Sequence, residues 1–111
     1  TYNVSDAPSA GNNCLIHTLV SLAGLAPDRV APLRATLVGE HLSVDNDFID
    51  FGGADGRRLI ELIQAESEAT YTIHVHMIDH NGMLHDFAMG AGDTAVHLLW
   101  QDNHFSPLKK G

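Results

Sequence analysis

The hydrophobic period of the chain changes at Thr70, and this change constrains the fold more than any other feature. Before it, apolar residues recur at helical spacing, and after it they alternate at every second position, as on strands. One domain of 111 residues is therefore predicted, with helices first and strands afterwards. We expect an α+β fold in which the N-terminal helices pack on one side of a C-terminal antiparallel β-meander.

Three helices are predicted before the change of period. The first covers residues 14–23 and ends at Gly24, and the second covers residues 27–39. Asp55 is a candidate N-cap for the third helix, over residues 57–68. Residues 1–13 are polar and broken by proline and glycine, which indicates an extended lead-in.

Four strands are predicted after Thr70, over residues 71–78, 83–89, 95–100 and 104–108. Short turns join them, with Asn81-Gly82 in the first and Asp102-Asn103 in the last. Because each turn is short, we expect each strand to pair with the next along the chain.

Composition excludes several classes of protein. The 14 acidic residues outnumber the 6 basic ones and give a net charge of −8, which argues against nucleic acid as a partner. No apolar run is long enough for a membrane span, and no signal peptide is visible. Since the chain starts at Thr1 and not at Met, we expect a domain cut from a longer protein, whose own localisation the sequence does not indicate.

The chain has a single cysteine, Cys14, at the start of the first predicted helix. The positive end of a helix dipole favours the thiolate, which is the reactive form, although a lone cysteine is more commonly a small core residue. Ninety residues later, His104 follows a tight turn at the start of the last strand. A cysteine early on a helix and a histidine late on a strand form the layout of a papain-like cysteine hydrolase.

Thiol catalysis also needs oxyanion donors and a group that orients the base. The backbone N–H of Cys14 is one candidate donor, and the side-chain amide of Asn12 or Asn13 is a second. Several residues could orient His104, and the sequence leaves the choice open among Ser106, Asp86, Asp6, Asp102 and Asn103.

Other polar residues have simpler interpretations. His74 and His76 share a strand face and His80 follows in the turn, so a metal site is conceivable, but a polar outer sheet face is favoured. Residues 45–47 are acidic but lack the glutamate of an EF-hand loop. No metal and no cofactor is predicted.

Two segments resemble a known family, the ovarian-tumour (OTU) cysteine proteases. Gly11-Asn12-Asn13-Cys14-Leu15-Ile16-His17 resembles the nucleophile motif of that family, and residues 96–100 followed by Asn103-His104-Phe105 resemble its closing hairpin. The resemblance implies a papain-like fold and cleavage of isopeptide or peptide bonds after ubiquitin or a ubiquitin-like protein. Gly11 stands where the family has an acidic residue, and Ser106 where it often has Asp or Asn.

The resemblance also implies roles for the two residues. Cys14 attacks the carbonyl to form a thioester, and His104 takes and returns the proton. Compact members of the family resemble domains of viral polyproteins, bacterial effectors and toxins, so we expect action in the cytosol, the host's cytosol for an effector or toxin. Three alternatives remain: a toxin that deamidates a glutamine or cleaves another protein with the same pair, a non-catalytic binding module, and a metal-binding protein using His74, His76 and His80.

Overall fold

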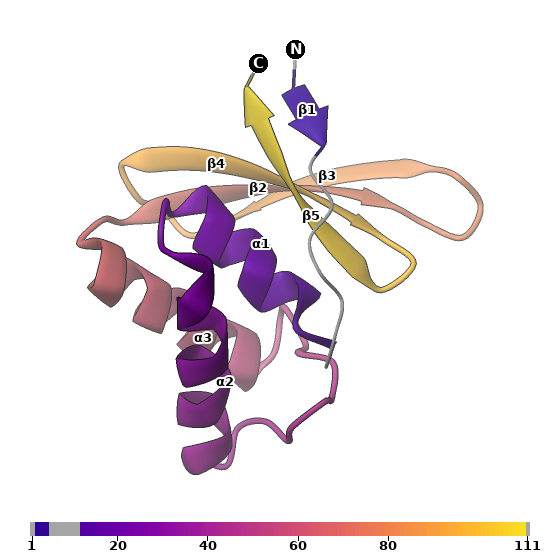
Figure 1. Ribbon diagram of the computed structural model, residues 1–111. Coiled ribbons are helices and arrows are strands. Elements are labelled where there is room, and N and C mark those ends of the chain that lie inside the picture. The colour runs from indigo at the N-terminus through magenta and orange to yellow at the C-terminus, as the bar shows by residue number, and fades with distance from the viewer. Residues whose placement is uncertain (1, 5–11, 111) are drawn as a thin grey trace.

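The computed structural model describes residues 2–4 and 12–110, and its helices lie together on one side of a sheet (Figure 1). The helices are α1 (Cys14–Leu22), the short 3-10 helix η2 (Pro27–Arg29), α2 (Val30–Gly39) and α3 (Ala54–Ser67). The strands are β1 (Tyr2–Val4), β2 (Tyr71–Ile78), β3 (Leu84–Met89), β4 (Thr94–Gln101) and β5 (His104–Lys110). The change of period at Thr70 therefore marks the boundary between α3 and β2, as predicted.

Helix α1 ends at the predicted glycine. Gly24 has a φ of 71°, in the left-handed region, and its N–H donates to the carbonyl of Ser21 at 3.1 Å. The N–H of Leu25 donates to the carbonyl of Val20 at 3.0 Å. These two bonds form a Schellman cap, which stops the helix and directs the chain toward α2.

Helix α3 starts earlier than predicted, and the expectation that Asp55 is its N-cap is wrong. The helix begins at Ala54, and Gly53 is the capping residue, with extended backbone. The Asp55 carboxylate lies within the first turn, where it accepts hydrogen bonds from the backbone N–H groups of Gly56 and Asp50. The aspartate therefore fastens the preceding loop to the helix.

The sheet is mixed, so the predicted antiparallel meander is wrong. The strand order is β1-β5-β4-β2-β3, and β4 pairs with β2 in parallel, whereas the other neighbours are antiparallel. Strand β3 pairs only with β2 and forms an edge. The lead-in contains β1, which the sequence analysis treated only as extended chain, and β1 pairs with β5 so that both ends of the chain lie side by side (Figure 1).

The connection between β3 and β4 explains the parallel pair. It crosses the start of β2, where the N–H of Gly92 donates to the carbonyl of Tyr71 at 3.2 Å. A Cβ on Gly92 would lie 2.1 Å from the backbone nitrogen of Tyr71, so only glycine allows this approach. Gly90 has a φ of 82°, also in the region that glycine favours. The crossing moves the chain from one side of β2 to the other, which makes β4 parallel to β2.

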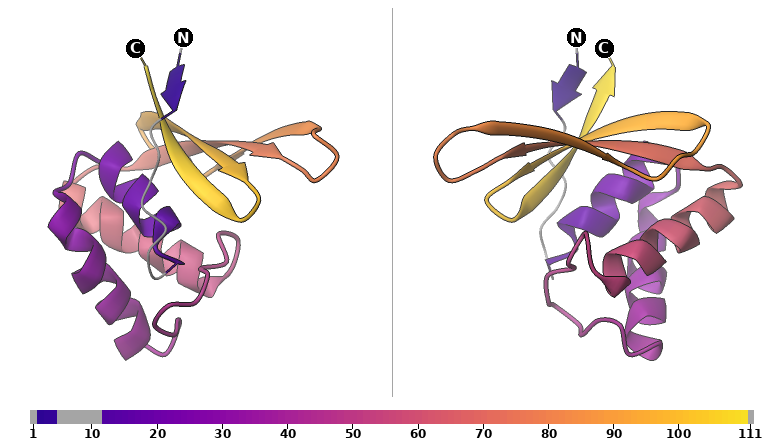
Figure 2. Two further views of the ribbon diagram at one scale, coloured as in Figure 1. Left: turned by 45° about the vertical axis from the view of Figure 1, so that its right-hand side comes forward. Right: turned by 180° about the vertical axis from the view of Figure 1, so that it is seen from behind.

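The core lies between the helices and the facing side of the sheet. Both views of Figure 2 show the helices on that one side. Strand β2 alternates as predicted, with Tyr71, Ile73 and Val75 buried. The largest fully buried side chains come from all parts of the chain and include Leu15, Ile16, Leu37, Phe51, Leu59, Ile73 and Leu98. None of the described helices combines the length and the apolar character needed to cross a bilayer.

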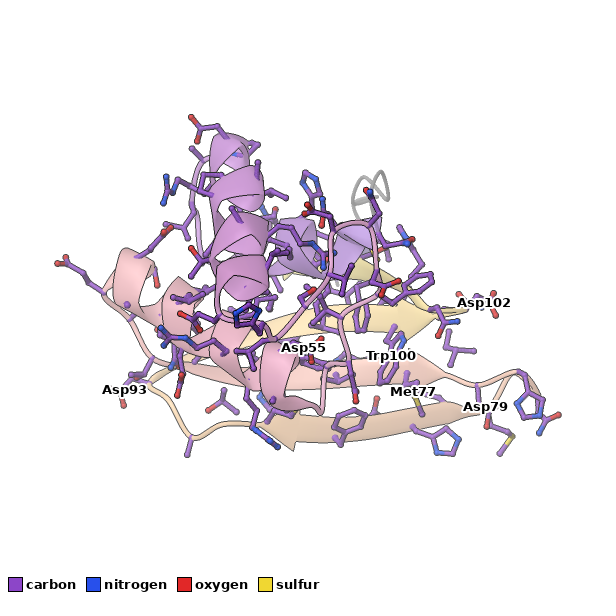
Figure 3. The ribbon with its side chains drawn as sticks, turned by 90° about the horizontal axis from the view of Figure 1, so that it is seen from below. Asp55, Met77, Asp79, Asp93, Trp100 and Asp102 are labelled. Carbon is purple, nitrogen blue, oxygen red and sulfur yellow. The ribbon has the colours of Figure 1, made fainter. Side chains whose placement is uncertain are left out.

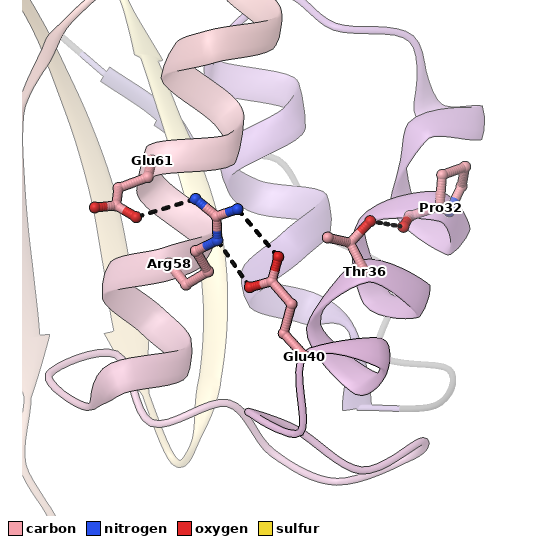
Figure 4. A network of polar contacts seen from close by, with 5 residues as sticks. All are labelled: Pro32, Thr36, Glu40, Arg58 and Glu61. Carbon is pink, nitrogen blue, oxygen red and sulfur yellow. Dashed lines mark hydrogen bonds and ion pairs between the residues drawn. The ribbon is translucent and has the colours of Figure 1, made fainter.

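Surface ion pairs join α3 to the residues on either side of α2, namely Glu40, which follows it, and Arg29, the last residue of η2. The Arg58 guanidinium donates to both carboxylate oxygens of Glu40, at 2.8 and 3.0 Å, and to Glu61 at 3.2 Å (Figure 4). Near the other end of α3, Arg29 pairs with Glu66 at 2.6 Å. These pairs are exposed, so they contribute little to stability and mainly fix how the two helices meet.

Candidate active site

The structure brings Cys14 next to the residue that precedes His104. Cys14 is the first residue of α1 and is 3% exposed. Its thiol donates a weak hydrogen bond to the carbonyl oxygen of Asn103, with an Sγ–O distance of 3.8 Å. Since α1 packs against β5, the N-terminus of the helix and the start of the strand lie together. The thiol of Cys14 and the backbone next to His104, which are far apart in the sequence, therefore lie side by side.

A tight hairpin delivers His104. Asp102 and Asn103 have φ values of 53° and 62°, and two positive values at the centre of a two-residue loop are typical of a type I′ turn. His104 then pairs with Gln101 across the hairpin. Side chains alternate along a strand, so His104 and Ser106 lie on one face of β5 and Phe105 on the other, as expected from the sequence.

Three aromatic side chains hold this hairpin against the loop before α3. The rings of Trp100 and Phe105 stack with centroids 5.0 Å apart. Phe51 meets the ring of Phe105 edge to face at 5.7 Å and that of Trp100 at 6.4 Å. Because Phe51 and Phe105 are buried, the position of the His104 backbone is fixed by packing as well as by the turn.

A groove opens beside the hairpin. The loop before α3 lines it with Phe48, Ile49, Asp50 and Phe51. The hairpin lines it with Trp100, Asn103 and Phe105. Trp100 lies beside Met77, its partner on β2, at the end of the sheet that also carries Asp79 and Asp102 (Figure 3). A groove of mostly apolar residues, with Asp50 as its one acidic member, therefore adjoins Asn103, the residue in contact with the thiol.

The turn before Cys14 places two asparagines at the helix N-terminus. Asn12 has a φ of 57°, which asparagine tolerates better than most residues, and its side-chain amide donates to the carbonyl of Asn46. Asn13 occupies the N-cap position, yet its side chain makes no capping hydrogen bond. The first turn of α1 also holds no acidic residue. The helix N-terminus beside the thiol is therefore neither capped by Asn13 nor neutralised by a carboxylate.

The side chain of Asn13 is held instead by Arg34, which the sequence analysis missed. Arg34 is 4% exposed on α2, and its Nε–H donates to Oδ1 of Asn13 at 2.8 Å. Its terminal nitrogens donate to the carbonyl of Asn12 at 3.1 Å, to Oγ of Ser43 at 2.6 Å and to the carbonyl of Asp47 at 2.8 Å. Burial lowers the pKa of Arg34, while the charges of Asp45, Asp47, Asp55 and Cys14 raise it.

The signal for Arg34 was present in the sequence. It lies between Val30 and Leu37 on the predicted apolar stripe of the second helix, at spacings of four and three residues. An arginine on a buried stripe needs hydrogen-bond partners inside the protein. The sequence could indicate the burial of this cation but not that its partners would be the turn before Cys14.

The candidates for orienting His104 are placed in different regions. Ser106 is buried on the same face of β5. Asp86 lies on β3, separated from β5 by two strands, and its carboxylate contacts Nδ1 of His76 at 2.7 Å, so the structure does not bring it to His104. Asp6 lies outside the described residues. Within the described part of the chain, no side chain forms a hydrogen bond with the His104 ring.

Three histidines, His74, His76 and His97, gather on the outer face of the sheet. Nε2 of His76 lies 3.0 Å from Nδ1 of His97, and the ring of His74 stacks on that of His97 with centroids 4.6 Å apart. Burial, and then the charges of His74 and His76, lower the pKa of His97. Across residues 2–4 and 12–110, no group of three or more His, Cys, Asp or Glu side chains is arranged to hold a metal ion.

Comparison with known proteins gives a structural match but no sequence match. Neither a protein-family model nor a curated protein sequence matches the chain. The structure is similar to that of the Hazara virus OTU, solved bound to ubiquitin, with a TM-score of 0.56 over 97% of this chain and 80% of the viral chain. The chain folds like a viral OTU domain. At 20% sequence identity, the similarity extends to the fold, and the roles of individual residues depend on the geometry above.

Proposed function

We propose that the chain is a cysteine protease that cleaves isopeptide or peptide bonds after ubiquitin or a ubiquitin-like protein. One observation carries the proposal: the only thiol of the protein lies at the first residue of α1, 3.8 Å from the carbonyl of the residue before His104. Similarity in fold to a viral OTU that binds ubiquitin supports the choice of substrate.

In the proposed mechanism, Cys14 is the nucleophile and His104 the general acid and base. The thiolate attacks the carbonyl carbon of the scissile bond, and the carbonyl oxygen becomes an oxyanion. As the intermediate collapses, His104 gives a proton to the leaving amine and a thioester remains. Water, deprotonated by His104, then attacks the thioester and releases the acid product and the thiol.

The uncapped N-terminus of α1 suits the oxyanion. Backbone N–H groups of a first turn have no acceptor within the helix, and the dipole adds positive potential there. The backbone N–H of Cys14 and the side-chain amide of Asn13 are the proposed donors. Asn12 is the weaker candidate because its amide already donates to Asn46.

Two alternative functions are compatible with this fold. One uses Cys14 and His104, and the other needs neither of them. A glutamine deamidase, or a protease for another protein, would employ Cys14 and His104 in the same roles. A non-catalytic binding module would keep the fold without a reactive thiol. The test below separates these possibilities.

The test is reaction with a ubiquitin probe that carries an electrophile at its C-terminus. We expect a covalent adduct, visible as a mass increase of one ubiquitin, that is absent in Cys14→Ala and slowed at least about 10²-fold in His104→Ala. Absence of an adduct with the unmodified protein, together with activity on another protein, would contradict the ubiquitin assignment. Slow alkylation of Cys14 by iodoacetamide, unchanged in His104→Ala, would indicate a binding module.

Because the protein has one cysteine, loss of the adduct in Cys14→Ala alone does not distinguish a catalytic thiol from an accidental one. The matched control is Asp93→Cys in the Cys14→Ala background, which places a thiol on the exposed connection between β3 and β4. We expect this protein to react with iodoacetamide but not with the ubiquitin probe.

A further inference from the structure

We infer that Arg34 is a positioning residue for the oxyanion donors, because it binds the acceptor end of Asn13 and so leaves the N-terminus of α1 uncapped. This inference deepens the proposed function and rests on it for its effect on turnover. Its structural part stands on the hydrogen bonds of Arg34 and can be measured without any substrate.

The N-cap residue of α1, Asn13, lacks the hydrogen bond that a capping side chain usually makes. An asparagine at this position normally accepts a hydrogen bond from the backbone N–H of the second or third helical residue, here Leu15 or Ile16. Such a bond would turn the side chain of Asn13, a proposed oxyanion donor, toward the helix backbone and reduce the positive potential at the helix N-terminus. In this structure Oδ1 of Asn13 accepts from Nε of Arg34 at 2.8 Å, and the capping bond is absent.

The other end of the Asn13 side chain, its NH₂ group, remains available as a donor. A guanidinium is only a donor, so it fixes which end of the amide is the oxygen. The NH₂ group of Asn13 is then the end left over, and no described residue accepts a hydrogen bond from it. Arg34 thus binds the only acceptor of the Asn13 side chain. The groups that remain at the helix N-terminus, the NH₂ of Asn13 and the backbone N–H groups, are donors.

Arg34 also ties the turn before Cys14 to residues 43–47. Arg34 also donates to the carbonyl of Asn12 and, across the site, to Ser43 and Asp47. The amide of Asn12 donates to Asn46 in the same segment. The turn before Cys14 is therefore joined to residues 43–47 by a buried fork of donors, a geometry that a lysine cannot reproduce.

The test compares Arg34→Lys with the matched surface variant Arg58→Lys. In Arg34→Lys we expect kcat for a ubiquitin-linked substrate to fall about 10²-fold with KM changed less than about threefold, because oxyanion stabilisation is lost and binding is not. Alkylation of Cys14 by iodoacetamide, which needs no oxyanion donor, should change less than about threefold. Arg58→Lys should leave all three quantities unchanged.

A second measurement covers the case in which the proposed function fails. Hydrogen exchange of the Leu15 and Ile16 amides should slow about fivefold in Arg34→Lys, because Asn13 becomes free to cap the helix, and should return to the original rate in Arg34→Lys/Asn13→Ala. A third variant, Asn13→Asp, keeps an acceptor for Arg34 but removes the NH₂ donor, and should also lose about 10²-fold in kcat.

The outcomes separate the two claims. If the unmodified protein lacks ubiquitin-directed activity but the exchange rates change as stated, the proposed function fails and the role of Arg34 at the N-cap stands. If Arg34→Lys is folded and both kcat and the exchange rates are unchanged, the inference is overturned. It is equally overturned if kcat, alkylation and the folded fraction all fall together, since that pattern marks a purely structural residue.

Discussion

At the scale of the residue, Thr18 stands out because it lies one helical turn after Cys14 and is completely buried. Its hydroxyl is the one buried side-chain polar atom, among the described residues, that has no hydrogen-bond partner. A buried hydroxyl without a partner loses its hydration and regains nothing, which costs about 1–3 kcal/mol. The helix that carries the nucleophile therefore contains a local source of instability.

Thr18→Val should raise the free energy of unfolding by about 1 kcal/mol, because valine has nearly the same shape and no hydroxyl to satisfy. Denaturant unfolding measures the change. The control is Thr36→Val on α2, where the exposed hydroxyl donates to the carbonyl of Pro32 (Figure 4), and its effect should stay within about 0.5 kcal/mol. Destabilisation by Thr18→Val would mean that this hydroxyl has a partner.

The group that orients His104 is also a question at this scale. Ser106 shares its face of β5, so Ser106→Ala should lower kcat for a ubiquitin-linked substrate about tenfold, which is less than the contribution of the base itself. Asp86→Asn should leave kcat unchanged, because this carboxylate lies on β3 against His76. An unchanged kcat in Ser106→Ala, with a loss in Asp6→Asn, would assign the role to Asp6 instead.

At the scale of the element, the periods of the sequence predict where helices and strands lie but not which strands are neighbours. Every predicted strand and helix is present, with ends that either coincide with the prediction or differ from it by at most three residues. Alternation says which face of a strand is buried, and it is the same for a parallel and an antiparallel neighbour. The order of β2, β3 and β4 depends instead on Gly90 and Gly92, whose close approach to Tyr71 involves no periodic signal.

Gly92→Ala tests that explanation. The new methyl group would lie 2.1 Å from the nitrogen of Tyr71 and 2.2 Å from the carbonyl carbon of Thr70, both backbone atoms, so the crossing must shift. We expect a loss of about 3 kcal/mol in the free energy of unfolding. Gly39→Ala is the control, because nothing lies within 4 Å of its Cβ position, and it should be neutral or slightly stabilising. Equal effects of both changes would contradict the proposed role of the crossing.

The candidate site, like the fold, has a part that the sequence could predict and a part that it could not. The positions of Cys14 at a helix start and of His104 after a tight turn could be predicted, because both features have local signals. Arg34 and its bonds to Asn12 and Asn13 could not, because they depend on how α2 packs against the turn before α1. Tertiary contacts of a single long side chain leave no pattern in a sequence beyond an unexpected charge on an apolar stripe.

At the scale of the whole molecule, the described groups with shifted ionisation act together on acid stability. Burial lowers the pKa of His17 and, with the charges of His74 and His76, that of His97. Among the carboxylates, hydrogen bonds lower the pKa values of Asp79, Glu40 and Glu66. In each case the folded protein binds fewer protons than the unfolded chain between the two pKa values, so stability decreases as pH falls.

The free energy of unfolding should therefore fall from about pH 7 through the histidine range, and again below about pH 4.5. His97→Gln should flatten the first decrease in part, since His17 still contributes to it. Denaturant unfolding at fixed ionic strength from pH 7.5 to 3.5 measures both decreases. A rise in stability on acidification from pH 7.5 to 5.5 would show that the histidines prefer to be charged in the folded protein.

The contact between Cys14 and the last hairpin has a consequence for the order in which the molecule forms. During synthesis the thiol of Cys14 emerges well before residues 103 and 104, which supply its carbonyl contact and its proposed base. Contacts between such distant parts of a chain are slow to form, because a large loop must close first. A nascent chain that ends before residue 104 holds a nucleophile without a base, so the proposed protease cannot act until the last hairpin of this domain has been made.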